Sequence, residues 1–420
     1  MSFKRYPAYK DSGVEWLGQV PEHWEIVQFK QFVDIQNGSD HKHVEQADGY
    51  PVLGSGGVFT YASDFLYDGE SVLLGRKGTI DKPLHITGRF WTVDTMYWTK
   101  INPAASGRFT YYSALTIPFD YYSTNTALPS MTKGALSSHS VALPPLPEQT
   151  QIAAFLDRET AKIDGLVAEQ RRLMALLKEK RQTVISHAVT RGLDPDVPMK
   201  PSGIEWLGDV PAHWDVKPVK AVCKLFGRIG YRGYTTADIV DEGEGAITLS
   251  PSNMADGVVS VDKSTYISWD KYSESPEIML QPGDIVMVKT GSTFGKVAYV
   301  SEVKHPTTIN PQLVLFKNIT CVSRFLFFIF CSGHVKAFID VNNTGSSIPT
   351  MTQESIRNFG FELPPKQEQE AVIHFVDMAL AKLDTLTTEA QRAIDLLQER
   401  RTALISAAVT GHIDVRKEND

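Results

Sequence analysis

A long internal repeat constrains this chain of 420 residues more than any other feature of its sequence. The segment Lys10–Trp24 returns as Lys200–Trp214, and both copies carry Ser-Gly-x-Glu-Trp-Leu-Gly followed by Val-Pro-x-His-Trp. A second pair, Leu143-Pro-Pro-Leu-Pro-Glu-Gln and Leu363-Pro-Pro-Lys-Gln-Glu-Gln, opens two helical stretches. The second pair is further apart in sequence than the first, so the copies differ in the length of what lies between the signatures. This pattern indicates a duplicated frame around two divergent inserts.

Each Leu-Pro-Pro signature introduces a predicted helix of about 44 residues, or about 66 Å at 1.5 Å per residue. Pro147 suits a first helical turn, Glu148 complements the positive end of the helix dipole, and Gly192 and Gly411 end the two helices. Apolar residues recur in steps of three and four, as in a coiled-coil seam. The predicted seam residues are Ile152, Leu156, Ile163, Leu166, Leu173, Leu177 and Val184, then Val372, Val376, Leu383, Leu386, Leu397 and Leu404.

The short connector 194–200 favours antiparallel pairing of the two helices, related by a pseudo-twofold axis that places the two inserts at opposite ends. The alternative is that each helix packs only on its own domain. Tyr9-Lys-Asp-Ser-Gly matches the sequence after the first helix, so we expect the N-terminal segment to complete the frame around the end of the second helix.

The inserts mix short alternating runs, Gly-rich turns and apolar helices, which predicts compact α/β domains. The expected fold class is α+β, with two such domains and two long antiparallel coiled-coil helices. The apolar run Phe325–Phe330 is interpreted as buried core, and it is far shorter than the roughly 20 residues that cross a bilayer. The predicted boundaries are 1–142 for the first domain with its frame segment, 143–192 for the first helix, 193–362 for the second domain with its frame segment, 363–411 for the second helix and 412–420 for a tail.

Local basic loops are the candidates for contact with nucleic acid, because the net charge of −7 gives no overall attraction. Arginine and lysine contact phosphates and guanine edges, while hydroxyls and loop amides hold phosphates. The alternative for each loop is an ordinary solvated surface. The candidates are Lys42, His43, Ser55, Arg76 and Lys77 in the first insert, and Lys224, Arg228, Tyr231, Arg232, Lys289, Ser292, Thr293 and Lys296 in the second.

Catalytic signatures are absent or incomplete in the sequence. Gly291–Val297 is one residue shorter than a phosphate-binding P-loop and lacks its magnesium-binding hydroxyl. Asp284 with Glu302-Val-Lys304 has the residue types of a metal-dependent nuclease but a loose spacing. The three cysteines, Cys223, Cys321 and Cys331, show no metal-binding spacing and indicate a reducing compartment. We therefore predict no catalytic residues and no metal site.

The doubled Ser-Gly-x-Glu-Trp-Leu-Gly and Leu-Pro-Pro signatures resemble those of the specificity subunit of type I restriction-modification systems, over essentially the whole chain. The resemblance implies two target-recognition domains that each read half of a split sequence in double-stranded DNA, spaced by the helix pair. It implies catalytic partners: two methyltransferase subunits that use S-adenosylmethionine, and restriction/translocase subunits that use ATP and magnesium. It also implies that the protein is located in the cytoplasm of a bacterium or archaeon and that this chain itself binds no cofactor.

The two halves of the sequence differ from each other in two features. Ala379, Ala390 and Ala393 thin the second seam, and Lys366-Gln367 replaces Leu-Pro in the second signature, so partner contacts of the two halves need not be equal. Two other functions stay open from the residues alone: a coiled-coil adaptor that binds only proteins, suggested by the acidic balance, and a stand-alone nuclease built on Asp284 and Glu302.

Overall fold

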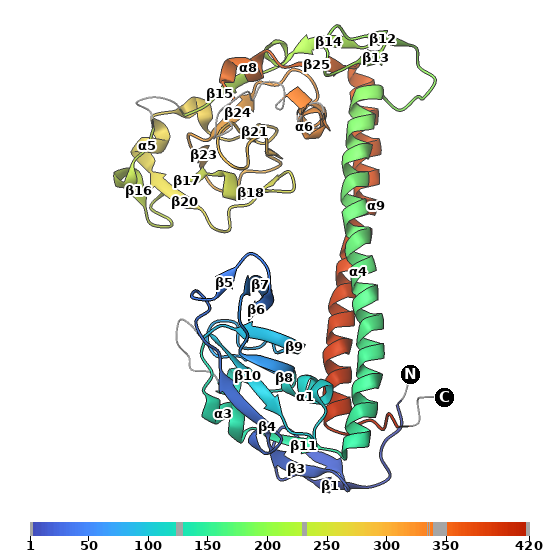
Figure 1. Ribbon diagram of the computed structural model, residues 1–420. Helices are drawn as coiled ribbons and strands as arrows, with labels where there is room; N and C mark the ends of the chain where they lie inside the picture. The colour runs from blue at the N-terminus through green and yellow to red at the C-terminus, as the bar shows by residue number, and fades with distance from the viewer. Residues whose placement is uncertain are drawn as a thin grey trace. The chain divides into compact units, whose positions relative to one another are not determined.

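The computed structural model describes residues 3–122, 129–228, 233–333, 335, 337, 338 and 351–416. The chain divides into two compact units (Figure 1). Unit 1 comprises Met1–Arg172 with Gln391–Asp420, and unit 2 comprises Leu173–Ala390. Each unit contains one insert and one part of each long helix, α4 (Leu146–Arg191) and α9 (Lys366–Val409).

Unit 1 contains a mixed sheet of seven strands in the order β4-β10-β8-β9-β6-β7-β5. Two further strand pairs, β1·β2 and β3·β11, belong to the repeated frame. The strands are β1 (Tyr9–Asp11), β2 (Gln19–Pro21), β3 (Glu25–Gln28), β4 (Val33–Asn37), β5 (Glu45–Gln46), β6 (Tyr50–Gly54), β7 (Gly57–Ala62), β8 (Tyr67–Gly75), β9 (Leu84–Thr92), β10 (Met96–Ile101) and β11 (Ser140–Leu143). The short helices are η1 (Phe29–Gln31), α1 (Gly107–Ala114), α2 (Phe119–Tyr122) and α3 (Lys133–Ser138).

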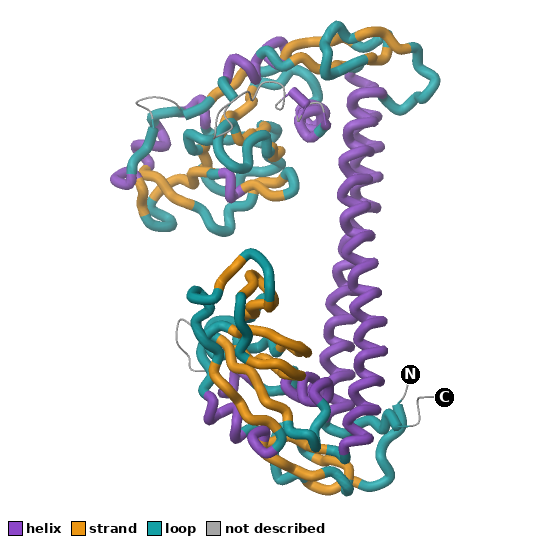
Figure 2. Tube along the Cα trace, viewed as in Figure 1, coloured by secondary structure: helices purple, strands orange, loops and turns teal. Residues whose placement is uncertain are grey.

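Unit 2 repeats the frame pairs as β12·β13 and β14·β25 and adds sheets of six and four strands. The six-stranded order is β15-β24-β21-β22-β19-β18, and the four-stranded order is β16-β20-β17-β23. The strands are β12 (Met199–Pro201), β13 (Asp209–Pro211), β14 (Asp215–Pro218), β15 (Lys224–Phe226), β16 (Ile239–Val240), β17 (Gly245–Leu249), β18 (Met254–Ala255), β19 (Val258–Val259), β20 (Thr265–Ser268), β21 (Ile285–Val288), β22 (Val297–Tyr299), β23 (Thr307–Ile309), β24 (Leu313–Lys317) and β25 (Gly360–Leu363). The short helices are η2 (Val219–Ala221), η4 (Thr236–Asp238), η5 (Pro251–Asn253), α5 (Trp269–Ser273), η6 (Pro276–Ile278), α6 (Ser323–Cys331) and α8 (Gln353–Arg357). The predicted mixed α+β class is confirmed, and Figure 2 shows the strand-rich inserts beside the two long helices.

The two long helices pair in antiparallel register within each unit. In unit 1 the guanidinium of Arg401 lies 2.9 Å from the Asp164 carboxylate, and in unit 2 Arg181 pairs with Asp384. The step from Asp164 forward to Arg181 along α4 equals the step from Arg401 back to Asp384 along α9, as antiparallel helices require. Gly192 and Gly411, with φ of +76° and +77°, follow the two helix ends as predicted.

The buried seam differs from the prediction at every second position. Leu166, Leu173 and Leu386 are wrong as seam residues, because their exposed fractions are 52%, 40% and 45%. The positions turned away from solvent are Thr160, Ile163, Val167, Gln170, Met174, Leu177 and Arg181 in α4, and Val376, Leu380, Leu383, Thr387, Ala390, Ile394, Leu397, Arg401 and Leu404 in α9. Of the other predicted residues, Val184 is half-buried and Ile152, Leu156 and Val372 are buried.

The two repeated signatures contact each other at one end of each helix. Glu148 and Glu368, from the Leu-Pro-Pro signatures, accept hydrogen bonds from His23 and His213 of the Val-Pro-x-His-Trp signatures, each at 2.8 Å. The next residues, Gln149 and Gln369, each donate to the carbonyl of the first proline of the signature, also at 2.8 Å. The same contacts in both units explain why these sequence segments recur.

The glutamines also attach the inserts to the frame. Gln149 Oε1 accepts from the backbone N–H of Ser106, the N-cap of α1, and Gln369 Oε1 accepts from that of Val322, the N-cap of α6. Helices α1 and α6 therefore occupy equivalent places in the two inserts.

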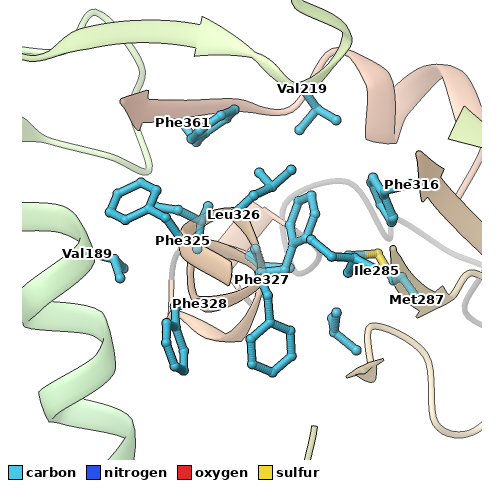
Figure 3. Close-up of a cluster of buried hydrophobic side chains, with 14 of the residues drawn as sticks. Val189, Val219, Ile285, Met287, Phe316, Phe325, Leu326, Phe327, Phe328 and Phe361 are labelled. Carbon is cyan, nitrogen blue, oxygen red and sulfur yellow. The ribbon is translucent and has the colours of Figure 1, made fainter. Parts of the chain in front are cut away.

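The apolar run of the second insert is core, as predicted. Phe325–Phe330 lie in helix α6, and every one of these side chains is at most 8% exposed. Figure 3 shows α6 between Val189 of helix α4 and Phe316 of the sheet, with Phe361 of the frame beside it. Among the described residues, no helix combines the length and apolarity that a membrane span needs.

The segments near the two chain ends meet inside unit 1, as the sequence predicted. The N–H of Asp414 donates to the carbonyl of Lys4 at 2.8 Å, and the Tyr9 hydroxyl donates to the carbonyl of Gly411 at 3.0 Å. The guanidinium of Arg416 lies 4.7 Å from the centre of the Tyr6 ring. The N-terminal segment thus completes the frame around the end of α9.

Candidate nucleic-acid interface

Three basic or Gly-rich loops of unit 1 gather around the turn that joins β9 to β10, residues 93–95. The N–H of Ser39 donates to Thr92, that of Val93 donates to Leu53 at the end of β6, and that of Arg76 donates to Thr95. These bonds lie between 2.9 and 3.2 Å. The predicted candidates of unit 1 are therefore carried by segments that the fold brings together, although they lie far apart in sequence.

The side chains of this region present positive and aromatic groups. Lys42, His43 and Lys77 are exposed, and Arg76 and Ser55 are half-buried. The His43 ring packs against the buried Trp91 at 5.5 Å, which anchors the loop. The adjoining hairpin between β6 and β7 exposes 58% of Phe59, an apolar group that can lie against bases or sugars. Sequence reasoning missed Phe59, although its position two residues after a Gly-Gly turn was a usable signal.

In unit 2, the loop between β21 and β22 carries four of the predicted candidates. Ser292 and Thr293 are exposed, and Lys289 and Lys296 are half-buried. The loop closes through bonds from the N–H of Gly295 to Val288 and from the N–H of Val288 to Lys296. Burial lowers the pKa of Lys289, so this ammonium lies in a partly desolvated place where an anion interacts with it more strongly.

The remaining candidates of unit 2 do not join this loop. Arg228 is only 1% exposed, and its guanidinium donates to the carbonyl of Ile309 at 3.1 Å and to the Thr308 hydroxyl at 3.3 Å. This corrects its assignment as a surface contact: Arg228 supports the backbone of β23. Lys224 is exposed but pairs in register with Lys317, at the end of β24 remote from the loop. Tyr231 and Arg232 lie outside the described residues.

The residues considered for nuclease chemistry do not form a metal centre. Asp284 is buried and pairs with the Lys317 ammonium at 3.2 Å, and burial raises its pKa above the usual range despite that cation. Glu302 is exposed and pairs with Lys304. Across the part of the chain that the structure describes, no three His, Cys, Asp or Glu side chains converge as metal ligands do.

Each insert is also held to the frame by an arginine on its equivalent helix. Arg108 of α1 pairs with Asp157 of α4, and Arg324 of α6 pairs with Asp377 of α9 at 2.7 Å. Burial raises the pKa of Asp157, but hydrogen bonds from Arg108 and Tyr112 lower it more, so the net pKa lies below the usual range. Sequence reasoning missed these anchors, although the two aspartates follow their Leu-Pro-Pro signatures at the same spacing.

Comparisons with known proteins place this arrangement in one family. The family described as "Type I restriction modification DNA specificity domain" matches residues 21–171 and 212–395. The MjaVIII specificity subunit of Methanocaldococcus jannaschii is 21% identical over 96% of this chain and 95% of its own length. The EcoBI specificity subunit of Escherichia coli is also 21% identical, over 97% of this chain and 90% of its own.

Solved structures share the fold. A chain from a structure described as "Structural basis underlying complex assembly and conformational transition of the type I R-M system" matches with a TM-score of 0.66 at 15% identity, covering 93% of this chain and 98% of its own. The HsdS subunit of Thermoanaerobacter tengcongensis matches with a TM-score of 0.51 at 14% identity, covering 94% and 98%. With the repeated frame, the two unlike inserts and the family match over most of its length, the chain belongs to the specificity subunits of type I restriction-modification systems, which supply DNA sequence specificity and are not themselves catalytic.

Proposed function

We propose that this chain recognises a bipartite sequence in double-stranded DNA, with the insert of each unit reading one half. The observation that carries the proposal is the pairing of one frame with two unlike inserts. The frame contacts recur in both units, whereas the exposed loops differ in residues and in length. Identical frames with different contact loops suit one task performed on two different sequences.

The DNA-contacting surface of unit 1 is assigned to the loops around residues 93–95, and that of unit 2 to the loop between β21 and β22. Both present cations and hydroxyl groups at the ends of strands, where a rigid sheet fixes their positions. Local cations of this kind provide salt-dependent attraction to phosphates even on an acidic chain. An adaptor that binds only proteins would have no use for these loops.

The helix pair is assigned the role of a spacer that sets the gap between the two half-sites. Its seam keeps steps of three and four from Thr160 to Arg181 and from Val376 to Leu404, so one heptad added to each helix preserves the pairing. One heptad lengthens a helix by about 10 Å, close to three base-pair steps of about 3.4 Å. We expect the preferred gap to grow by about three base pairs.

The outer faces of the helices are assigned to partner subunits. They expose leucines at positions that the seam does not use, including Leu166, Leu173, Leu176, Leu386 and Leu396. Exposed apolar residues in such number indicate a protein contact surface. We assign this surface to the two methyltransferase subunits. Leu173→Gln with Leu176→Gln should weaken co-purification of those subunits, whereas the matched substitution Glu169→Gln on the same helix should not.

The deciding experiment selects binding sites from random duplexes with the chain assembled with its methyltransferase subunits. Two short motifs at one fixed gap are expected. A single contiguous motif would refute bipartite reading, and no enrichment at all would favour the adaptor. An unchanged gap in the chain lengthened by one heptad per helix would refute the spacer role alone.

The finer organisation follows from the same proposal. The first recognition domain with its frame segment is 1–142, the second is 193–362, the spacer helices occupy 143–192 and 363–411, and 412–420 form a tail. S-adenosylmethionine, ATP and magnesium are assigned to the methyltransferase and restriction/translocase subunits. The complex is assigned to the cytoplasm of a bacterium or archaeon, where its DNA substrate lies.

A further inference from the structure

Arg76 and Lys289 occupy the same position in the two recognition domains. The N–H of Arg76 donates to Thr95, the residue before β10, and the N–H of Lys289 donates to Gln312, the residue before β24, each at 2.9 Å. The strand order β4-β10-β8-β9 of unit 1 corresponds to β15-β24-β21-β22 of unit 2, and every neighbouring pair is antiparallel in both. Arg76 follows β8 and Lys289 follows β21, which are corresponding strands.

A second pair of bonds supports the equivalence. The carbonyl of Arg76 accepts from the N–H of Met131 at 2.9 Å, and that of Lys289 accepts from the N–H of Met351 at 3.0 Å. These methionines belong to the short repeat Met-Thr, whose threonines cap α3 and α8. It is the part of the inserts that recurs most clearly, so both domains have the contact that positions the backbone of their cation.

The chain after each cation makes the same kind of turn. Arg76 is followed by Lys77, Gly78 and Thr79, and Lys289 by Thr290, Gly291 and Ser292. Gly78 has a φ of +81° and Gly291 a φ of +112°, which side-chain-bearing residues rarely adopt. Both domains thus present a cation, a glycine turn and a hydroxyl in the same order. Sequence alignment alone gives little sign of this, because the surrounding residues differ.

Both cations are open to an anion, and that of Arg76 is also held in orientation by its neighbours. Arg76 donates to the carbonyl of Asp94 at 3.3 Å and lies 5.8 Å from the centre of the Tyr97 ring, which orients its guanidinium. Lys289 is half-buried. Within the described ranges, neither side chain forms an ion pair with a carboxylate. Each cation therefore keeps its charge available for a ligand from outside the chain.

We propose that Arg76 and Lys289 each contact a DNA phosphate, at corresponding positions of the two half-sites, and so orient each domain on the duplex without reading a base. The inference deepens the proposed function and rests on it. Two domains with unlike contact loops read different bases, so a feature that both preserve serves what the half-sites have in common. That common ligand is the sugar-phosphate backbone, whose contacts position a protein and carry no sequence information.

The test measures DNA affinity against salt concentration for the full chain assembled with its methyltransferase subunits, using the selected duplex and duplexes with single altered base pairs. Arg76→Ala and Lys289→Ala should each lower affinity about tenfold at low salt, by the same factor on every duplex, and reduce the salt slope by about one. Arg76→Lys and Lys289→Arg should retain the slope, which separates loss of charge from loss of folding.

A matched control comes from the far end of strand β10. Lys100 on β10 is an exposed lysine of the same sheet as Arg76, and Lys100→Ala should leave the slope unchanged. Relaxed preference at one base pair in either the Arg76→Ala or the Lys289→Ala variant would overturn the inference in favour of base reading. Unchanged affinity and slope would overturn it outright. Absence of bipartite binding by the unaltered complex would instead refute the proposed function.

Discussion

Replacing the frame glutamate by alanine should destabilise the two copies of the frame by very different amounts. Glu148 is 6% exposed, and one of its oxygens accepts from the Tyr6 hydroxyl at 2.7 Å and from the Trp24 indole at 3.2 Å. Its counterpart Glu368 is more exposed and accepts from His213 at 2.8 Å. The indole N–H of the equivalent Trp214 has no acceptor among the described residues. The unit 1 copy therefore carries more of the frame's stability.

Glu148→Ala leaves two buried donors without an acceptor, and each costs roughly 1–3 kcal/mol, or about 4 kcal/mol together. At 1.36 kcal/mol per decade, local opening should become about 1,000-fold more frequent. Glu368→Ala removes a half-exposed bond worth about 1 kcal/mol, or about fivefold. Hydrogen exchange measured by mass spectrometry on peptides covering 3–24 and 193–214 reports these openings separately.

Glu148→Gln keeps an acceptor oxygen and should fall between the other two variants. Equal loss of protection at the two sites would refute the reasoning, because it would mean that the buried donors of unit 1 contribute nothing. Protection lost at both sites from Glu148→Ala alone would also contradict it, since the contacts of Glu148 are confined to unit 1.

Two further predictions concern pH and the seam. Burial lowers the pKa of His139 to about 4, so the unfolded chain takes up its proton first and the free energy of unfolding should fall by about 3 kcal/mol between pH 6.5 and 4. In His139→Asn, the free energy of unfolding measured with urea should depend less on pH across that window, whereas His374→Asn, at an exposed histidine, should leave the dependence unchanged. An unchanged pH dependence in His139→Asn would contradict the lowered pKa of His139. In the full chain, Val167→Ala should cost about 2 kcal/mol and Leu166→Ala less than about 0.5 kcal/mol by urea unfolding; the reverse order would restore the seam predicted from sequence.

The seam error has a simple physical cause. Steps of three then four and of four then three have the same average of about 3.5 residues, so periodicity alone does not choose between them. Leu166 and Leu173 make one choice look more apolar, but the seam contains Val167, which is buried, and Met174, which is half-buried. Only packing against the partner helix decides, and the ion pair between Asp164 and Arg401 marks the register that results. Helix ends were easier to predict, because proline and glycine act locally.

The candidate interface was predictable in kind but not in detail. Residue type identified Lys289 and Arg76 as cations in Gly-rich loops, and the fold leaves both accessible. The same reasoning failed for Arg228, because nothing local reveals that its guanidinium is buried and donates to the carbonyl of Ile309. The correspondence of Arg76 with Lys289 needed the strand order, since their surroundings share few residues.

The duplicated frame makes the two inserts interchangeable, which gives a final prediction. Each insert enters and leaves through neighbouring antiparallel strands, with Glu25 opposite Leu143 in unit 1 and Asp215 opposite Leu363 in unit 2. Replacing residues 25–143 by a second copy of 215–363 therefore joins the chain at matching points. The transplanted Arg324 should meet Asp157 in place of Arg108, since both arginines lie on the helix that the frame glutamine caps.

The chimera should select a target in which both halves are the second half-site. Because the helices pair in antiparallel register, these halves should form an inverted repeat. Site selection with the assembled methyltransferase complex checks this, and the unaltered chain is the control. A direct repeat would contradict the pseudo-twofold relation that the sequence predicts. A target that kept the original first half would mean that residues 25–143 do not read it, and the assignment of one insert to each half-site would fail.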